Sequence, residues 1–197
     1  SGISYQEAMS DLLSAINEVS KTPDDNTARA SLVQSAVSFI DRSQLIYNGL
    51  TKYQNNLNIQ VANITDRINE IGEQIKTLNK QISAIETGVE TAMTLRDERD
   101  LLLDELSGYA KIEYTEDKNG VVSVMLEGNF FCDGLSVSKL GLETIEGTDF
   151  YIPVWKEMHN TPVYNMEKSI STAKNTDIGS LKGVLVARGT ITPTFAN

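Results

Sequence analysis

The sequence predicts a mainly α protein with a smaller β part (α+β), in which an elongated helical rod or bundle carries a small antiparallel β subdomain. Three observations support this class. Apolar residues recur at alternating intervals of four and three through residues 57–89, the heptad pattern of an α-helix that packs along one narrow stripe. No proline interrupts the chain between Pro23 and Pro153. After Gly108 the helical period gives way to short aromatic and β-branched runs between turn residues.

Composition narrows the functional class. The chain has 197 residues, 40% of them hydrophobic and 22% charged, as expected for one or two folded domains. Its net charge of −10 argues against nucleic acid or an anionic membrane as partners, because both attract clustered Lys and Arg. One cysteine, Cys132, excludes an intrachain disulfide framework. We expect neither a membrane span nor a signal peptide, because no apolar run approaches the required length.

The first helix is predicted over residues 4–20. Ser4 and Glu7 have the spacing of a capping box, and apolar residues follow at helical intervals. Residues 21–25 form a turn around Pro23, and their aspartates suit the start of a second helix.

The second helix is predicted from about residue 25 to residue 86, with Gly88 just beyond its end. Its unbroken heptad stripe, called the seam below, comprises Leu57, Val61, Ile64, Ile68, Ile71, Ile75, Leu78, Ile82, Ile85 and Val89. The stripe continues more weakly back to Leu32. Positions beside the seam are almost uncharged and include Asn58, Gly72 and Asn79. A self-contained parallel dimer normally has opposed charges there, so we interpret the seam as part of an assembly module that packs against several helices.

The remaining elements are shorter. A third helix is predicted over residues 95–107, with a possible cap at Thr94. A hairpin follows over residues 109–127, with Asn119-Gly120 in its turn. Gly128-Asn129 offers a second turn. Further strands are predicted over residues 130–137, 149–155 and, more weakly, 161–165. A short helix is predicted over residues 178–188, with Asp177 as its cap.

We therefore expect a helical rod domain over residues 1–107, to which residues 176–197 return. A small β-rich subdomain is expected over residues 108–165.

No catalytic or metal-binding pattern is present. His159 lies among turn residues, and Cys132 follows two phenylalanines, as a small buried hydrophobic residue would. One His and one Cys do not make a zinc site. The acidic cluster over residues 96–105 is interpreted as a charged helix face on which Arg96 and Asp100 pair. We expect no enzyme activity, no cofactor and no metal.

Three stretches resemble the flagellar hook-associated protein 1 family. The first is residues 12–29, a short helix, a Pro-Asp turn and the start of the long helix. The second is residues 95–107, similar to the family's L-x-D-x-R-D-x-L-L-D-E-L-S segment. Its matching residues are Leu95, Asp97, Arg99, Asp100, Leu102, Leu103, Asp104, Glu105 and Leu106. The third and weakest is residues 179–188, similar to G-S-L-G-G-L-L-x-x-R. Lys21 stands where the family usually has Asn.

The resemblance implies a secreted, non-enzymatic structural subunit of the bacterial flagellum, at the junction between hook and filament. Implied partners are neighbouring copies in a ring, the hook protein, the third hook-associated protein and an export chaperone, with no nucleic acid and no membrane. Export through the flagellar type III channel and an extracellular location follow. The family's terminal segments are absent here, so a core fragment is expected. The alternatives are another axial protein (flagellin-like or the third hook-associated protein) and a generic coiled-coil adaptor.

Overall fold

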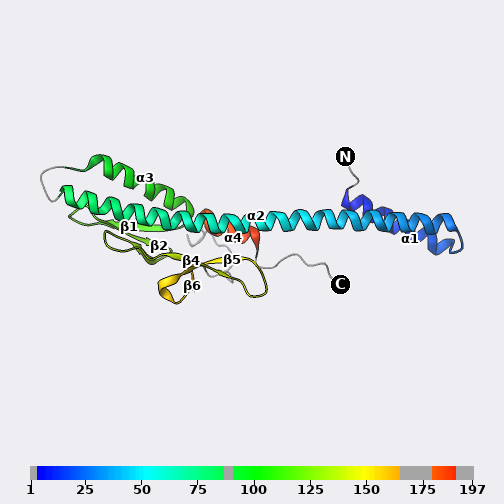
Figure 1. Ribbon diagram of the computed structural model, residues 1–197. Coiled ribbons are helices and arrows are strands. Elements are labelled where there is room, and N and C mark those ends of the chain that lie inside the picture. Colours follow the sequence, from blue (N-terminus) through cyan, green and yellow to red (C-terminus); the bar gives the residue numbers. More distant parts are fainter. Residues whose placement is uncertain (1–3, 87–90, 165–178, 190–197) are drawn as a thin grey trace. The chain divides into compact units, whose positions relative to one another are not determined.

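The structure is a computed structural model that describes residues 4–86, 91–164 and 179–189. Long α-helices and two small antiparallel sheets make it up (Figure 1), which confirms the predicted mainly α class with a smaller β part. Contacts divide the described chain into unit 1, residues 4–53, and unit 2, residues 54–189. Each unit is described by itself below.

Unit 1 is a helical hairpin of α1 (Tyr5–Lys21) and the first part of α2 (Asn26–Glu86). The predicted capping box starts α1: Glu7 N donates to Ser4 Oγ at 3.2 Å, and Ser4 N donates to the Glu7 carboxylate at 2.6 Å. The rings of Tyr5 and Phe39 lie 5.4 Å apart. This contact joins the start of α1 to α2 and shows that the two helices run antiparallel.

The long helix is described up to Glu86, and that residue also organises the start of the next helix. α3 (Met93–Tyr109) has Ala92 as its N-cap and no side-chain cap. Instead, Ala92 N donates to the Glu86 carboxylate at 3.1 Å. The predicted Thr94 cap is therefore wrong, because the cap oxygen comes from the preceding helix. Gly88 lies outside the described residues.

Sheet A has the order β1-β2-β3, formed by β1 (Ile112–Glu116), β2 (Val122–Leu126) and β3 (Asn129–Cys132). The predicted hairpin is confirmed, with Gly120 at φ +76° in its turn. The second turn is centred on Glu127 and Gly128, which both have positive φ, one residue earlier than predicted.

The strand predicted over residues 130–137 ends early, at Cys132. The Asp133 carboxylate accepts hydrogen bonds from Leu135 N at 2.7 Å and Ser136 N at 2.8 Å. These bonds turn the chain directly after the strand.

Sheet B has the order β4-β5-β6, formed by β4 (Leu140–Thr144), β5 (Tyr151–Trp155) and β6 (Thr161–Pro162). Two of these strands match predicted ones, whereas β4 was not predicted, because Gly141 interrupts its short apolar pattern. After the 3₁₀ helix η1 (Lys156–Met158), the last described element is α4 (Ser180–Arg188). Its N-cap is Gly179; the predicted Asp177 cap lies outside the described residues.

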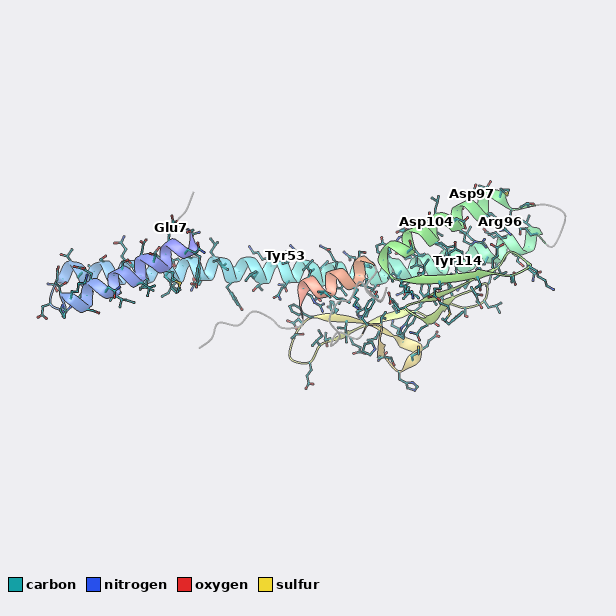
Figure 2. The ribbon with its side chains drawn as sticks, turned by 180° about the vertical axis from the view of Figure 1, so that it is seen from behind. Glu7, Tyr53, Arg96, Asp97, Asp104 and Tyr114 are labelled. Carbon is teal, nitrogen blue, oxygen red and sulfur yellow. The ribbon has the colours of Figure 1, made fainter. Side chains whose placement is uncertain are left out.

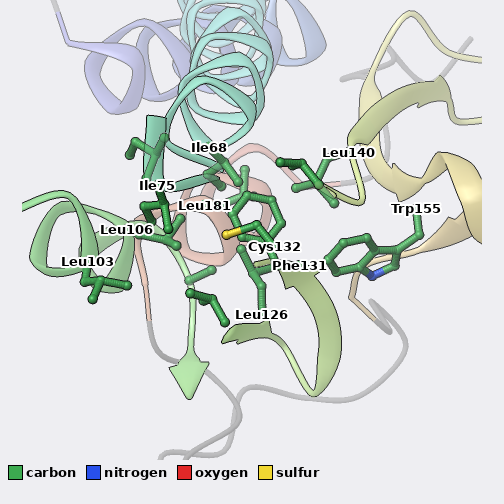
Figure 3. Close-up of a cluster of buried hydrophobic side chains, with 14 of the residues drawn as sticks. Ile68, Ile75, Leu103, Leu106, Leu126, Phe131, Cys132, Leu140, Trp155 and Leu181 are labelled. Carbon is green, nitrogen blue, oxygen red and sulfur yellow. The ribbon is translucent and has the colours of Figure 1, made fainter. Parts of the chain in front are cut away.

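One hydrophobic core holds unit 2 together. α2, α3, α4 and both sheets all contribute to it, and Figure 3 shows its side chains meeting around Phe131 and Cys132. A smaller cluster of Leu78, Ile82 and Ala92 joins α2 to the start of α3. Among the described helices, none is both long and apolar enough to cross a membrane.

Candidate functional site

The seam lies inside unit 2. Seven of its ten residues are at most 7% exposed: Leu57, Val61, Ile68, Ile71, Ile75, Leu78 and Ile82. Ile64 packs partly buried against the same core, Ile85 is 38% exposed, and Val89 lies outside the described residues. The seam is thus a helix-packing stripe whose partners are α3, α4 and the strands of its own chain.

The uncharged positions beside the seam contact the β part of the chain as well as other helices. A Cβ atom at Gly72 would lie 2.7 Å from Phe131 Cζ and 2.9 Å from Val137 Cγ1. Real Cβ atoms do not approach that closely, so glycine lets the Phe131 ring rest on the helix backbone. The small flank of α2 serves close packing, as predicted, but the packed partner is the β part.

Two asparagines of α2 hold strand backbone directly. Asn79 Oδ1 accepts from Val122 N at 3.1 Å, and Asn79 Nδ2 donates to Val122 O at 2.8 Å. Asn69 does the same for Leu140, accepting from its N at 2.8 Å and donating to its O at 3.0 Å. Each side-chain amide therefore replaces one missing neighbour strand.

A third asparagine completes the set. Asn58 accepts from Tyr151 N at 2.7 Å and donates to Asp149 O at 2.9 Å. The three asparagines, called the amide clamps below, are ten or eleven residues apart, close to three helical turns. Their hydrogen bonds attach both sheets to one side of α2. From the sequence, Asn58 and Asn79 were recognised only as uncharged positions beside the seam. Polar residues that recur beside an apolar stripe could have indicated contacts with strand backbone.

The residues of the 95–107 segment divide into a packed group and an exposed group. Arg99 is only 1% exposed. Its Nη1 donates to Asn79 Oδ1 at 3.0 Å and to Gly120 O at 2.5 Å, and its Nη2 donates to the Glu116 carboxylate at 3.1 Å. Arg99 thus joins α3, α2 and the β1–β2 hairpin. Leu103 and Leu106 are buried in the core of unit 2. Leu95 and Leu102 pack against the smaller cluster that joins α2 to the start of α3.

Ion pairs fix the same segment to α2. Arg67 donates from Nε and Nη2 to the Glu105 carboxylate, both at 2.8 Å, which keeps the pKa of Glu105 below its usual value. Arg96 donates to both Glu86 oxygens, at 2.7 and 2.6 Å, and this contact lowers the pKa of Glu86 to about 2. Arg96 also pairs with Glu116 at 2.7 Å. The predicted Arg96–Asp100 pair is therefore wrong.

The exposed group is acidic. Asp97, Asp100 and Asp104 are solvent-exposed, and their carboxylates make no hydrogen bond or ion pair with any residue that the structure describes. Figure 2 shows Asp97 and Asp104 on the outer side of α3. The fold of the chain accounts for the arginine, leucine and glutamate positions of the segment, and it does not account for these three aspartates.

The 179–188 segment is also explained by packing. Gly179 has φ +106°, and a Cβ there would collide with the Tyr109 carbonyl. Leu181 and Leu185 are fully buried. Arg188 Nη1 donates to Asn58 Oδ1 at 2.7 Å and to Tyr151 O at 2.6 Å, so the segment fastens α4 to an amide clamp.

Unit 1 has the opposite character, with large apolar side chains facing solvent. In α1 these are Met9, Leu13 and Ile16; in α2 they are Val33, Val37 and Ile40, all between 44% and 63% exposed. In each helix the three residues keep the spacing of four and three. We call these six residues the apolar face of unit 1.

Helix geometry places these six residues together. In each helix they directly follow packed positions such as Ala8 and Phe39. In an antiparallel pair, the residues that follow the packed row turn toward the same side of both helices. Further along α2, Leu45, Ile46, Leu50 and Tyr53 are also at least 41% exposed. An apolar surface of this extent is typical of an interaction site.

Cys132 and His159 show no catalytic arrangement with the other residues that the structure describes. Cys132 is fully buried, and burial raises the pKa of its thiol to about 12, as suits a core residue. His159 is exposed in a turn with φ 54°. Within the described ranges, no group of three or more His, Cys, Asp or Glu residues is placed to hold a metal ion.

Comparisons with known proteins agree on one family. The family model described as the flagellar hook-associated protein FlgK helical domain matches residues 1–197. The flagellar hook-associated protein 1 of Bacillus subtilis (strain 168) is 27% identical over 132 residues, covering 66% of this chain and 26% of that protein. Its counterpart from Escherichia coli (strain K12) is 25% identical over 191 residues, covering 91% of this chain and 32% of that protein.

A solved structure shows the same fold. The flagellar hook junction protein FlgK from Burkholderia pseudomallei superposes with a TM-score of 0.76 at 19% identity, over 94% of this chain and 33% of that chain. The chain thus spans about a third or less of the length of these relatives. With a family model that matches it from end to end, the chain belongs to the flagellar hook-associated protein FlgK helical domain family.

Proposed function

We propose that this protein is a structural subunit of the bacterial flagellum that forms the junction between hook and filament and assembles by helix packing with neighbouring axial subunits. The observation that carries the proposal is the apolar face of unit 1. Its six large side chains follow a regular helical stripe and are 44% to 63% exposed, so a further helix can pack along it.

The contrast with the seam supports the same conclusion. The seam is the most regular apolar stripe of the sequence, yet α3, α4 and the two sheets of the same chain already cover it. It is therefore not the surface offered to other subunits. We assign that role to unit 1, where the helices have apolar residues on two sides and the described residues pack on only one of them.

We propose that the partners of this surface are helical segments of the same axial assembly. They comprise neighbouring copies in a ring, other helical parts of the full-length protein, the hook protein and the third hook-associated protein. An export chaperone would hold the subunit before assembly. Export through the flagellar type III channel, which places the protein outside the cell, belongs to the same proposal, and no nucleic acid or membrane partner does.

We further propose that the helical and the β-rich parts of the chain occupy different positions in the assembly. The helical residues 1–107, with residues 176–197 returning to them, would form the packed axial part, and the β-rich residues 108–165 would face outward. The amide clamps support this arrangement, because they attach the sheets to one side of α2 and leave the strands no part in the apolar face of unit 1. We propose no catalytic role: the described residues form no set of converging nucleophile, base and acid.

The proposal is tested in the source bacterium with the full-length gene. A strain lacking the gene is complemented with the natural sequence, with Leu13→Asp plus Val37→Asp, or with the matched control Gln34→Asp at an exposed polar site on the same helix. We expect the double variant to abolish motility and filament attachment, and the control to restore both. Immunogold electron microscopy should place the natural protein at the hook–filament joint.

Other labelling patterns would contradict the assignment. Label along the whole filament would indicate a flagellin-like subunit, and label confined to the cell would indicate a coiled-coil adaptor. Normal motility of the double variant would show that the apolar face has no role in assembly.

A further inference from the structure

One large apolar side chain of α3 is left outside the core of unit 2. Leu101 is 70% exposed, whereas Leu103 is buried in that core. Asp97 and Asp104 lie four residues before and three residues after Leu101, which places the three side chains on one face of the helix. Figure 2 shows both aspartates on the outer side of α3. We call Asp97, Leu101 and Asp104 the α3 knob, an exposed apolar residue with acidic flanks.

A groove of about 550 Å³ lies beside α2, between that helix, the β1–β2 hairpin and the loop that follows β3. Lys80, Ser83 and Ala84 of α2 line it, together with Val121 and Leu135. Leu135 is 83% exposed, more than any other large apolar side chain that the structure describes. Lys80 is also exposed and forms no ion pair with a described residue. The groove therefore combines an exposed apolar residue with an ammonium group that no described carboxylate neutralises.

Two carboxylates in the groove are already engaged by backbone N–H groups. The Asp117 carboxylate accepts two hydrogen bonds from the backbone of its own turn, at 2.8 and 3.0 Å. Asp133 holds the turn after β3 in the same way. Lys118, next to Asp117 in the hairpin turn, adds a second exposed ammonium group. Lysines and aspartates thus balance in number at the groove, so a carboxylate from a partner can pair with Lys80.

Helix geometry places the α3 knob and the groove on opposite sides of α2. Leu78 packs with Leu95 and Leu102 of α3, whereas Lys80 lines the groove. Two residues turn an α-helix by about 200°, so Lys80 points away from α3. Figure 1 likewise shows α3 and the strands of sheet A on different sides of α2.

The α3 knob lies at the level of Asn79 along α2. Arg99 of α3 donates to Asn79 Oδ1 at 3.0 Å. Asp97 and Leu101 are each two residues from Arg99, which is about 3 Å along the helix axis. Both residues of the knob are therefore within one helical turn of Asn79 in height.

The groove lies at the same level. Lys80 directly follows Asn79. A Cβ atom at Gly134 would lie 3.8 Å from Asn79 Cβ, so Leu135, the next residue of the loop, is also close to that height. Like-oriented copies placed side by side would therefore bring the knob of one copy to the groove of the next without a large shift along the helix.

We propose that in the assembled junction the α3 knob of every copy docks in the groove of the next copy, with Leu101 against Leu135 and the Asp97 carboxylate beside Lys80. This inference rests on the function proposed above, because it requires like-oriented copies in a ring. The two surfaces are different, so the contact is head-to-tail and repeats from copy to copy until the ring closes.

The contact depends on the rest of the assembly. One pair of leucines and one solvent-exposed ion pair bind weakly by themselves. We therefore expect the isolated chain to be monomeric. The contact forms where other parts of the assembly hold neighbouring copies side by side, at a high effective concentration.

The first test crosslinks the contact in the source bacterium. The full-length gene carries Leu101→Cys together with Leu135→Cys, and isolated flagella are treated with a short thiol-specific crosslinker and immunoblotted. Because every copy contributes to two contacts, we expect a ladder of covalent multimers. Neither single variant should give one, nor should Leu101→Cys with Met158→Cys, at a 44% exposed site outside the groove. Cys132 is fully buried and should not react.

The second test reverses the charges of the proposed ion pair in the strain that carries both cysteines. Asp97→Lys or Lys80→Asp alone places like charges together and should slow ladder formation at least about threefold. The two reversals combined should restore the rate. Lys156→Asp, at an exposed site outside the groove, should leave it unchanged. Asp97→Cys plus Lys80→Cys is a second crosslinking pair for the same contact, in case the first pair of cysteines prevents assembly.

The inference fails on any of three results. One is the absence of a ladder with both cysteine pairs although immunogold label stands at the hook–filament joint. Another is a product that stops at dimers, which would indicate a contact between identical surfaces. The third is a double charge reversal that crosslinks no faster than the single reversals. Label away from the joint would instead overturn the proposed function, so the two failures are distinguishable.

Discussion

Units 1 and 2 use the same heptad pattern for different purposes. In unit 2 the stripe of α2 is covered: Ile68, Ile71, Ile75 and Ile82 are all fully buried. In unit 1 the buried hydrophobic residues are the alanines Ala8, Ala15 and Ala28, while large side chains such as Leu13 and Val33 are more than half exposed. The sequence pattern of a helix therefore reveals that it packs, but not whether its partner lies in the same chain.

The difference lies in how much chain surrounds each part of α2. Unit 2 adds two helices and two sheets to its portion of α2, and the amide clamps and Arg99 satisfy the backbone groups where these elements meet the helix. Among its described residues, unit 1 adds only α1. A two-helix hairpin that buries small residues gains little from the hydrophobic effect, so we expect unit 1 to be the less stable unit in isolation and to gain stability on assembly.

The largest expected effect comes from placing a charge in the covered stripe. Ile75→Asp buries an unpaired carboxylate where the natural side chain is fully buried, and it should destabilise unit 2 by about 3–5 kcal/mol. The matched control Ile40→Asp, at a 52% exposed site of the same helix, should change stability by less than about 1 kcal/mol. Trp155 is buried in unit 2, so its fluorescence during denaturant unfolding reports on that unit.

Equal destabilisation by the two aspartates would contradict the contrast between the units. It would mean that Ile40 is also covered in solution, for example by a second copy. Repeating the measurement at several protein concentrations separates that case from intrachain burial.

A smaller effect is expected from the arginine that joins α3 to the hairpin. Arg99→Met removes one hydrogen-bond partner from the buried acceptors Asn79 Oδ1 and Gly120 O, and from the partly exposed Glu116 carboxylate, and should cost about 3 kcal/mol. Asp100→Asn changes an exposed neighbour in the same segment and should have almost no effect on unfolding. If both variants unfold like the natural chain, Arg99 does not hold the hairpin in solution.

The sequence was sufficient for the features that depend on local periodicity and capping. The capping box at Ser4, the uninterrupted course of α2 and the hairpin turn at Gly120 all follow from short-range rules. The regular spacing of the seam also predicted that it packs against other elements, although it did not show whether those elements belong to the same chain.

What could not be predicted depends on partners far away in the sequence. Arg96 has two suitable acids outside its own helix, Glu86 and Glu116, and tertiary contact chooses them over the local partner Asp100. The clamp role of Asn69 requires Leu140, which is distant along the chain. The unpartnered apolar face of unit 1 has the same spacing as the seam, so its exposure appears only when the neighbouring elements are in place.

Two glycines of α2 offer a subtler comparison of the units. Gly72→Ala would bring a methyl group within 2.7 Å of the Phe131 ring, and such overpacking should cost about 1–3 kcal/mol, partly offset by about 1 kcal/mol of helix propensity. Gly49→Ala, in unit 1, meets nothing within 4 Å and should stabilise its helix by about 0.5–1 kcal/mol. Thermal unfolding followed by circular dichroism should therefore shift in opposite directions; a stabilising Gly72→Ala would show that the ring is not seated on the helix.

The smallest effect we expect is a pH dependence that separates two glutamates of unit 2. Arg96 lowers the pKa of Glu86 from 4.5 to about 2. Because the folded-state pKa lies below the unfolded one, the stabilising contribution is present above pH 4.5 and is lost as the pH falls toward 2. Burial raises the pKa of Glu127 above 4.5, so its effect has the opposite sign, and ionisation as the pH rises through that value reduces stability.

Replacing each glutamate by glutamine distinguishes these opposite effects of pH on stability. Glu86→Gln should lower the stability of unit 2 at neutral pH and flatten its decline in acid, whereas Glu127→Gln, which retains an acceptor for Lys111 N, should preserve or raise stability at neutral pH. Both changes should be smaller than those above, because water screens the Glu86 pair and only part of Glu127 is buried. Denaturant unfolding followed by Trp155 fluorescence at a series of pH values measures both. If the two variants have the same pH profile, Arg96 does not hold Glu86 ionised, and the end of α2 is held to the start of α3 by the Leu78, Ile82 and Ala92 cluster rather than by this ion pair.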